Sequence, residues 1–434
     1  MRFLLLALSL SVAACDSAAP PAADTPAADT PAADTPAAAS SVAGIKTGIW
    51  RVVLEHPGGG LPFSLEITQG PEAYFLNGPE RMKAEEMTLQ DGALDIRFPS
   101  YESSLKAQLQ DDGTLVGSVT LTRRLGEVKK LAFPLVATHG QTWRHFPEQD
   151  PNPVDIAGTW AVKQSDPFGS APPRDGLGIF EQDGAIVTGT VMFSQGDYRW
   201  LQGEVKDGEL YLSTFDGGQG TVWRAAIQED GSLKGLFHAK SYGFPPIAWS
   251  AKRDPDAKLP NPNSFTKLKD GVERIDFTFP DPDGAMVSLS DAKFQNQVVV
   301  ISIGGTWCPT CHDEAAFLAP YYEANKDRGL EMIGLQFEYT DDPERSARQT
   351  KRFKQRYGIT YDMLIAGVFG KEGVAKALPF LDGLTAYPTT LFLDRSGQVR
   401  RIHTSFPGAA TGKRHELYVA EFKTFLNELL AEDG

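Results

Sequence analysis

Apolar and polar residues alternate with a period of two from about residue 48 to residue 249. In the segment 209–213, for example, Leu210 and Leu212 alternate with polar or amphipathic neighbours. Asp-Gly pairs and other turn formers interrupt the alternation roughly every 8–12 residues. Because successive side chains of a strand point to opposite faces, this pattern predicts antiparallel meanders with one buried face.

The same region matches itself. Gly48-Ile49-Trp50 corresponds to Gly158-Thr159-Trp160, and the Asp-Gly turns at 91–92 and 112–113 correspond to those at 207–208 and 230–231. Each copy has room for about eight short strands. The repeat therefore predicts two β-rich units, residues 45–146 and 154–253, each a small barrel, half-barrel or meander.

A proline- and asparagine-rich joint at residues 260–264 ends this pattern. Residues 298–303 then form a continuous β-branched apolar run, which is typical of a buried parallel strand. A helical pattern follows the run, and Pro320 should kink or end that helix. Further along, we expect strands at 330–337 and 361–365 and helices at 343–357, 373–380 and 415–430.

The N-terminal residues read as an export signal, with Arg2 before the apolar run 3–8. This run is far shorter than the roughly 20 residues of a membrane span, so no transmembrane helix is predicted. The run ends in Val12-Ala13-Ala14-Cys15, which resembles a bacterial lipobox, where the cysteine is lipidated and becomes the first residue. The alternative is an ordinary signal peptide with a cysteine near its cleavage site. We therefore expect a lipoprotein signal peptide at 1–14 and lipidation of Cys15.

Residues 15–44 are a low-complexity segment built on the repeat Pro-Ala-Ala-Asp-Thr. Without large apolar side chains, such a segment cannot offset the entropy lost on folding. We expect a lipid-anchored, disordered linker that ends near residue 44.

Composition narrows the function classes. With 42 basic and 56 acidic residues the net charge is −14, which disfavours nucleic-acid binding because phosphate recognition needs an excess of Lys and Arg. The apolar content of 41% excludes wholesale disorder. The three cysteines are Cys15, Cys308 and Cys311, too few for a disulfide-stapled scaffold.

The candidate chemistry lies in Cys308-Pro309-Thr310-Cys311, between the predicted buried strand and the following helix. The dipole at a helix N-terminus favours a thiolate. We therefore expect Cys308 to be the exposed nucleophile and Cys311 the more buried resolving thiol. A structural disulfide and a zinc site are alternatives. Structural zinc needs four ligands, and the nearest candidates besides the cysteines are His312, His403 and His415, so no metal site is predicted.

Trp307-Cys308-Pro309-Thr310-Cys311 after the β-run resembles the membrane-tethered thioredoxin-like thiol–disulfide oxidoreductases of the TlpA and ResA type. Residues 277–290 are similar to the N-terminal hairpin of that family, and residues 387–394 to the loop and strand with its cis-proline. The resemblance covers about residues 265–434. It implies the following site: a redox disulfide of Cys308 and Cys311, catalytic contributions from Glu314 and Pro388, and Trp307, Pro309, Thr310 and Tyr387 as active-site neighbours.

The predicted fold class is thus a duplicated antiparallel β-barrel or meander region followed by an α/β thioredoxin-like domain. The resemblance implies an exported, lipid-anchored enzyme without a cofactor that faces the periplasm or cell exterior. Its partners would be protein dithiol or disulfide clients, which it reduces, and a membrane thiol electron donor. An oxidase or isomerase is an alternative, since Cys-Pro-x-Cys also occurs in oxidants.

Two other function classes are alternatives. A peroxiredoxin-like peroxidase would need Thr three residues before its reactive cysteine, where this chain has Gly305. A non-enzymatic protein could bind a ligand or copper through its β units, since Cu(I) favours soft thiol ligands. For Glu314 we expect burial to raise the pKa, which suits proton transfer; the alternative is an acid that only complements the helix dipole.

Overall fold

The computed structural model describes residues 41–125, 127–169, 171–238 and 245–432. The predicted signal peptide, Cys15 and the linker up to residue 40 lie outside these residues. Strand β1 (Ser41–Val42) pairs with β2 (Ile45–Lys46), so residues 41–42 form a strand within the segment that was expected to be a disordered linker. No helix in the described part of the chain has the length and apolar character needed to cross a membrane.

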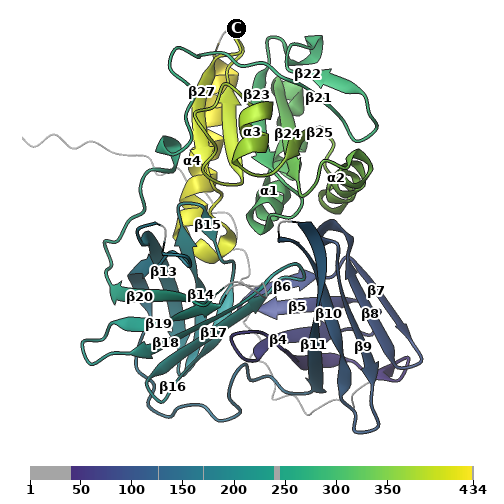
Figure 1. Cartoon of the computed structure of the whole chain (residues 1–434), viewed down its shortest axis with the longest axis vertical. Helices are drawn as coiled ribbons and strands as arrows, with labels where there is room; N and C mark the ends of the chain where they lie inside the picture. Colours follow the sequence, from purple (N-terminus) through teal and green to yellow (C-terminus); the bar gives the residue numbers. More distant parts are fainter. Residues whose placement is uncertain (1–40, 126, 170, 239–244, 433–434) are drawn as a thin grey trace, which may run out of the picture. The chain divides into compact units, whose positions relative to one another are not determined.

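The first β unit is an open, antiparallel nine-stranded sheet in the order β6-β5-β4-β3-β11-β10-β9-β8-β7 (Figure 1). Its two edge strands, β6 and β7, follow each other in sequence but do not pair, so the unit is a half-barrel. The strands are β3 (Gly48–Leu54), β4 (Leu61–Ile67), β5 (Ala73–Asn77), β6 (Glu80–Lys83), β7 (Glu86–Gln90), β8 (Ala93–Phe98), β9 (Ser103–Leu109), β10 (Leu115–Leu125) and β11 (Glu127–His139), with the 3-10 turn η1 (Pro99–Tyr101) between β8 and β9.

The second β unit is a closed barrel. Its order is β13-β12-β20-β19-β18-β17-β16-β14, and β14 also pairs with β13, which joins the two ends of the sheet. The short β15 (Gly196–Asp197) pairs only with β14. The other strands are β12 (Gly158–Gln164), β13 (Arg174–Asp183), β14 (Ile186–Phe193), β16 (Leu201–Lys206), β17 (Glu209–Phe215), β18 (Gly220–Ile227), β19 (Leu233–His238) and β20 (Ile247–Arg253).

The internal duplication predicted from the sequence is confirmed in the backbone. Trp50 and Trp160 are fully buried, and each donates its indole N–H to the carbonyl four residues earlier, at 2.9 and 2.8 Å. The paired Asp-Gly turns at 91–92 and 207–208 have almost identical left-handed φ values, 50° and 74° against 50° and 76°. Equivalent sequence motifs therefore form equivalent turns in both copies.

Side chains of each β unit pack into or bond to the other unit. Phe215 of β17 belongs to the hydrophobic core of the first unit, and its ring lies 4.5 Å from that of Phe63. Arg144, in the segment between the units, is buried and donates to the Leu76 carbonyl at 3.0 Å and to Ser213 Oγ at 3.1 Å. These contacts link β5 of the first unit to β17 of the second.

The C-terminal domain is a five-stranded sheet in the order β25-β24-β23-β26-β27 with helices on both faces (Figure 1). Strands β25, β24 and β23 are parallel, β26 runs antiparallel to β23, and β27 runs antiparallel to β26. The elements are β21 (Thr278–Pro280), β22 (Met286–Ser288), β23 (Val298–Gly304), α1 (Pro309–Asn325), β24 (Leu330–Glu338), α2 (Pro343–Tyr357), β25 (Asp362–Val368), α3 (Lys371–Ala377), β26 (Thr389–Leu393), β27 (Val399–Thr404) and α4 (Lys413–Ala431). The predicted order of strands and helices is thus confirmed.

Two cores cover the faces of this sheet. Leu318 of α1, Phe353 of α2 and Phe422 of α4 pack in one core, and Val374 of α3 packs with the β21–β22 hairpin in the other. Pro320 lies inside α1, so the expectation that it ends the helix was wrong, while the alternative of a kink stays a prediction. The apolar contacts of Leu318 and Tyr322 on both sides of Pro320 outweigh the one helical hydrogen bond that proline removes.

Candidate active site

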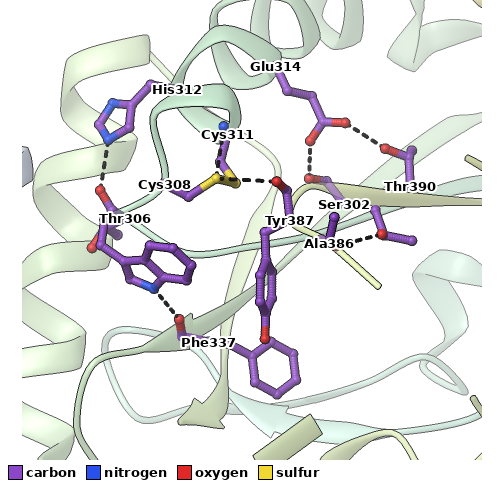
Figure 2. The surroundings of a disulfide bond; sticks show 12 residues. Ser302, Thr306, Cys308, Cys311, His312, Glu314, Phe337, Ala386, Tyr387 and Thr390 are labelled. Carbon is purple, nitrogen blue, oxygen red and sulfur yellow. Dashed lines mark hydrogen bonds between the residues drawn. A yellow bond between two sulfur atoms is a disulfide. The ribbon is translucent and has the colours of Figure 1, made fainter. Parts of the chain in front are cut away.

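A disulfide joins Cys308 and Cys311 at the start of α1, with the two Cα atoms 5.2 Å apart (Figure 2). Strand β23 ends at Gly304, and Cys308 is the N-cap residue of the helix. Its Sγ accepts the backbone N–H of Cys311 at 3.3 Å. The free N–H groups and the positive end of the helix dipole at this place stabilise a thiolate once the disulfide is reduced.

Pro388 lies opposite this cysteine pair. The Tyr387–Pro388 peptide bond is cis, as the family resemblance implied. The Tyr387 carbonyl oxygen lies 3.6 Å from Cys308 Sγ (Figure 2). The structure thus brings Pro388 and Tyr387 to the redox pair, while their roles in catalysis stay a prediction.

Trp307 is held beside the disulfide by the next strand. Its indole N–H donates to the Phe337 carbonyl at 2.9 Å, and its ring packs against those of Tyr387 and Phe369. Gly305 makes this arrangement possible, because a Cβ at that position would lie 2.4 Å from the Trp307 indole nitrogen and 2.6 Å from the Phe337 carbonyl oxygen. The threonine that a peroxidase needs at this position would not fit, which disfavours the peroxidase alternative.

Glu314 extends from α1 into the protein. It is only 2% exposed and accepts hydrogen bonds from the hydroxyls of Ser302 and Thr390, both at 2.5 Å (Figure 2). Burial raises the pKa of Glu314 to about 7, although these two hydrogen bonds act in the opposite direction. The expected shift is confirmed, and a role limited to the helix dipole does not explain a carboxylate placed against β23 and β26.

Cys311 and Glu314 line the same small cavity of about 10 Å³, together with Ser302 and Gln336. This volume is near the lower limit for one water molecule. Glu314 therefore lies beside the resolving cysteine, at a cavity that Cys308 and Tyr387 do not line.

The histidines considered as zinc ligands have other partners. His312 is buried, with Nδ1 2.7 Å from the Tyr357 hydroxyl and Nε2 2.8 Å from the Thr306 carbonyl oxygen. His403 Nδ1 contacts Asn263, and His415 Nδ1 contacts the Pro407 carbonyl. Across the described residues, no three His, Cys, Asp or Glu side chains are grouped to hold a metal ion.

The exposure expected for Cys308 was wrong. Cys308 is 3% exposed and Cys311 is 5% exposed, so the nucleophile is no more accessible than the resolving cysteine. Residues of the second β unit lie against the site, and Gln219 Nε2 donates to the Trp307 carbonyl at 3.4 Å. The prediction failed because the position of a cysteine between a strand and a helix does not show whether another domain covers it.

Ion pairs that the sequence analysis did not anticipate link the β units to the helices. Arg199, before β16, pairs with Asp313 of α1 at 3.0 Å and with Glu80 of the first unit at 2.6 Å. Burial raises the pKa of Asp313 to about 7, and nearby acids add to this shift while Arg199 opposes it. No local motif could have revealed this cluster, because its members come from three distant segments.

A second set of contacts involves the basic helix α2. Its residues Arg345 and Arg356 pair with Glu102 and Glu85 of the first β unit. Gln349 of the same helix donates to the carbonyl oxygen of Pro99 at 3.1 Å. The first unit thus contacts α2, and the second contacts the start of α1.

The sequence matches the AhpC/TSA family over residues 271–402. The chain is 28% identical over 149 residues to the thioredoxin-like protein YneN of Bacillus subtilis, covering 34% of this chain and 78% of that protein. It is 27% identical over 136 residues to the thiol-disulfide oxidoreductase ResA of Bacillus anthracis, covering 31% and 68%.

A solved structure of a putative thiol:disulfide interchange protein DsbE from Chlorobium tepidum overlaps 36% of this chain and 98% of that chain, with 19% identity and a TM-score of 0.27. The matches fall on the C-terminal domain, which has the cysteine pair described above. This domain is a TlpA/ResA-like thioredoxin-family domain, and the protein is a thiol–disulfide oxidoreductase.

Proposed function

We propose that the protein is an exported, lipid-anchored reductase of disulfides in cell-envelope proteins. The observation that carries the proposal is the position of Cys308 Sγ, between the N-terminus of α1 and the Tyr387 carbonyl before cis-Pro388. A sulfur atom in this place can react as a thiolate beside a backbone carbonyl that a client strand can pair with. The similarity to proteins named thiol-disulfide oxidoreductase supports the reaction class.

The reaction follows from the two sulfur positions. In the reduced protein, the Cys308 thiolate attacks one sulfur of a client disulfide, and the other client sulfur leaves as a thiolate. The Cys311 thiolate then attacks Cys308 Sγ, which releases the second client thiol and restores the disulfide of Cys308 and Cys311. The client gains two electrons, and a dithiol donor at the membrane supplies two further electrons that reduce the enzyme disulfide again while the donor is oxidised.

Glu314 serves the second step. A carboxylate with a pKa near 7 can accept the proton of the Cys311 thiol and return it to the leaving client thiolate. Its hydroxyl partners carry no charge, so the proton can move without breaking an ion pair.

The reduction potential tests the direction of electron flow. Equilibration of the full chain against glutathione buffers should give a potential on the thioredoxin side, near −270 mV. A value near −120 mV, typical of strong periplasmic oxidants, would contradict a reductase. Cys308→Ser should abolish exchange, while Cys311→Ser should accumulate mixed disulfides whose client proteins can be identified from the cell envelope.

A separate experiment tests the anchor. If Cys15 is lipidated, Cys15→Ser should release the protein from membranes and leave the thiol activity of the folded part intact. Stable anchoring needs more than one acyl chain, so loss of the whole lipid group should be decisive. Retention of Cys15→Ser on salt-washed membranes would contradict the anchor.

A further inference from the structure

A cavity of about 210 Å³ lies between the mouth of the closed barrel and the redox disulfide. The barrel contributes the ends of four strands, and the C-terminal domain contributes Trp307, Cys308 and Tyr387. Barrel mouths are common ligand sites, and this volume is below the range of about 300–1,000 Å³ for drug-sized ligands. Cys308 is 3% exposed and lines this cavity, so a substrate that enters the cavity can reach its sulfur.

The cavity wall holds hydrogen-bond donors without partners. Thr214 of β17 and Thr221 of β18 are directly opposite each other, are 6% and 3% exposed, and have hydroxyls that contact no polar atom of the described protein. A buried hydroxyl without a partner costs free energy unless a water or ligand satisfies it.

Arg174 adds a positive charge to the same wall. Its guanidinium lies over the Phe193 ring at 4.0 Å and donates to Gln164 Oε1 at 2.8 Å and to the Tyr198 hydroxyl at 3.1 Å. Among the described residues, no carboxylate forms an ion pair with Arg174. A guanidinium with only neutral partners retains the capacity to bind a carboxylate.

The two acids of the cavity wall accept backbone N–H groups. Asp197 accepts the backbone N–H groups of Gly408 and Arg199, both at 2.7 Å. Asp216 accepts the N–H groups of Gly218 and Gln219 in its own turn. Arg199 in turn is paired with Glu80 and Asp313. Arg174 is therefore the cationic side chain of the cavity wall that has no carboxylate partner among the described residues, and it suits an anionic acceptor ligand.

The duplication supplies an independent comparison. Aligned by their Trp motifs and Asp-Gly turns, the two copies place Leu54 and Leu61 of the first unit where the second has Gln164 and Arg174. Phe98 of the first unit corresponds to Thr214. At these three positions the first copy is apolar where the second is polar. Thr221 corresponds to Ser103, whose hydroxyl already donates to the Gly217 carbonyl, and only residues of the second unit line the cavity beside Cys308.

We propose that this cavity is the substrate site and binds a disulfide with a carboxylate close to one sulfur, held by Arg174 and the hydroxyls of Thr214 and Thr221. The inference rests on the proposed exchange reaction and adds its substrate class. The carboxylate belongs to a free amino-acid disulfide or to an acidic residue beside a client cysteine; both offer the same group.

The step balances as ordinary exchange. The Cys308 thiolate attacks the sulfur nearer the bound carboxylate, the bond between the two substrate sulfurs breaks, and the distal arm leaves as a thiolate that takes a proton from water. In a Cys311→Ser protein the reaction stops at this mixed disulfide, so its rate reports the first attack alone. An external dithiol supplies the electrons that prepare the reduced Cys308.

The experiment compares matched probes on the full chain with Cys311→Ser. Cystine and cystamine differ by their carboxylates, and two short peptide disulfides differ by Asp or Asn beside the cysteine. Mass spectrometry of quenched samples gives the rate of each mixed disulfide. Arg174→Gln removes the proposed carboxylate partner, and Thr221→Val removes one hydroxyl at constant shape. Arg253→Gln is the control, because Arg253 also lies over a barrel ring, that of Trp160, but does not line the cavity.

We expect the carboxylate probe of at least one pair to react about tenfold faster than its partner, the usual effect of a charge-assisted hydrogen bond. Arg174→Gln should bring this ratio close to one, Thr221→Val should lower it less, and Arg253→Gln should preserve it. Preference for cystine alone identifies a free disulfide, and preference for the Asp peptide identifies a polypeptide client. Equal rates within both pairs, or a ratio that Arg174→Gln leaves unchanged, would overturn the substrate class. If no probe forms an adduct, the proposed exchange function fails with it.

Discussion

The two β units begin from the same motifs, yet only the second closes into a barrel. In the second, the β13–β14 hairpin continues past the pair Phe180 and Gly189 for three further residue pairs. In the first, the hairpin ends at the equivalent pair, Ile67 and Ala73. The extra residues 186–188 and Gly189 are the ones that pair with β16. A longer hairpin therefore decides whether the sheet ends meet.

Closure also needs a close approach of the backbones. Gly189 has φ of +147°, and a Cβ at this position would lie 2.0 Å from the Ile179 carbonyl oxygen. Only glycine fits such a site. The equivalent Ala73 lies in a hairpin whose sheet stays open.

The difference has consequences for both units. A closed barrel pairs all its edges and fills its own core, so the side chains at its mouth are free to be polar. The open unit lacks that closure, and Phe215 of its neighbour completes its core. Duplication thus left one copy whose core depends on its neighbour and one copy beside the reactive cysteine.

Phe215→Ala is the largest test of this comparison. Loss of the ring should lower the free energy of unfolding by about 3–5 kcal/mol, because it leaves a cavity inside the first unit. Hydrogen exchange should become faster in β4 and β5. Phe237→Ala, in the core of the barrel itself, is the matched control and should leave β4 and β5 protected. Equal protection of β4 and β5 in both variants would show that the first unit does not need the second.

Arg144→Met tests the polar link between the units. The variant leaves the Leu76 carbonyl, Asn77 Oδ1 and the Ser213 hydroxyl without their buried donor. We expect a loss of about 3 kcal/mol in chemical denaturation. Arg81→Met, which removes an exposed pair with Glu66, should cost less than about 1 kcal/mol. If both variants cost the same, Arg144 does not hold the units together.

Glu314→Gln tests the contribution of a carboxylate buried within the C-terminal domain to the pH dependence of stability, separately from that of Asp313, which pairs with Arg199 of the second β unit. The pKa of Glu314 is raised from 4.5 to about 7 by burial, so the folded state binds a proton that the unfolded state releases. Its stabilising contribution is complete below pH 4.5 and is lost as the pH rises through 7, by up to about 3 kcal/mol.

Denaturation of the oxidised protein between pH 5 and 8 measures this loss. Glu314→Gln should flatten the fall in stability across that range. Asp313→Asn should remove only the separate contribution of Asp313, whose pKa burial raises to about 7 against the opposing charge of Arg199. A wild-type stability that does not fall between pH 5 and 8, or that falls no more than that of Glu314→Gln, would contradict a buried, protonated Glu314.

Gln219→Ala is the smallest test and asks which β unit covers Cys308. The variant removes the hydrogen bond to the Trp307 carbonyl, and we expect alkylation of reduced Cys308 by iodoacetamide to become about threefold faster, for a contribution of roughly 0.5–1 kcal/mol. Gln108→Ala removes a similar bond to a backbone carbonyl within the first unit and should not change the rate. Faster alkylation in Gln108→Ala would contradict the conclusion that the second unit, and not the first, covers Cys308.

Local features of the fold were accessible from sequence. The helix α2 was predicted at its observed bounds. In the structure Asp342 caps its start and Gly358 adopts a left-handed conformation at its end, so residues next to the helix set both bounds. The position of Cys308 between β23 and α1 followed from the apolar run before it. The cis bond before Pro388 was implied by the family resemblance; the local sequence pattern alone does not distinguish a cis from a trans proline.

The sequence by itself determined the repeat, the order of strands and helices, and the redox pair, because turn chemistry and hydrophobic periodicity act over a few residues. Only the tertiary structure decided that the second unit closes, that Phe215 and Arg144 join the two units, and that Cys308 is covered. These features depend on contacts such as Arg199 with Asp313 and Gln219 with Trp307, between segments about 90 or more residues apart. For the same reason the sequence did not predict that Arg174, Thr214 and Thr221 line one cavity, because these residues come from three strands that meet only in the folded barrel.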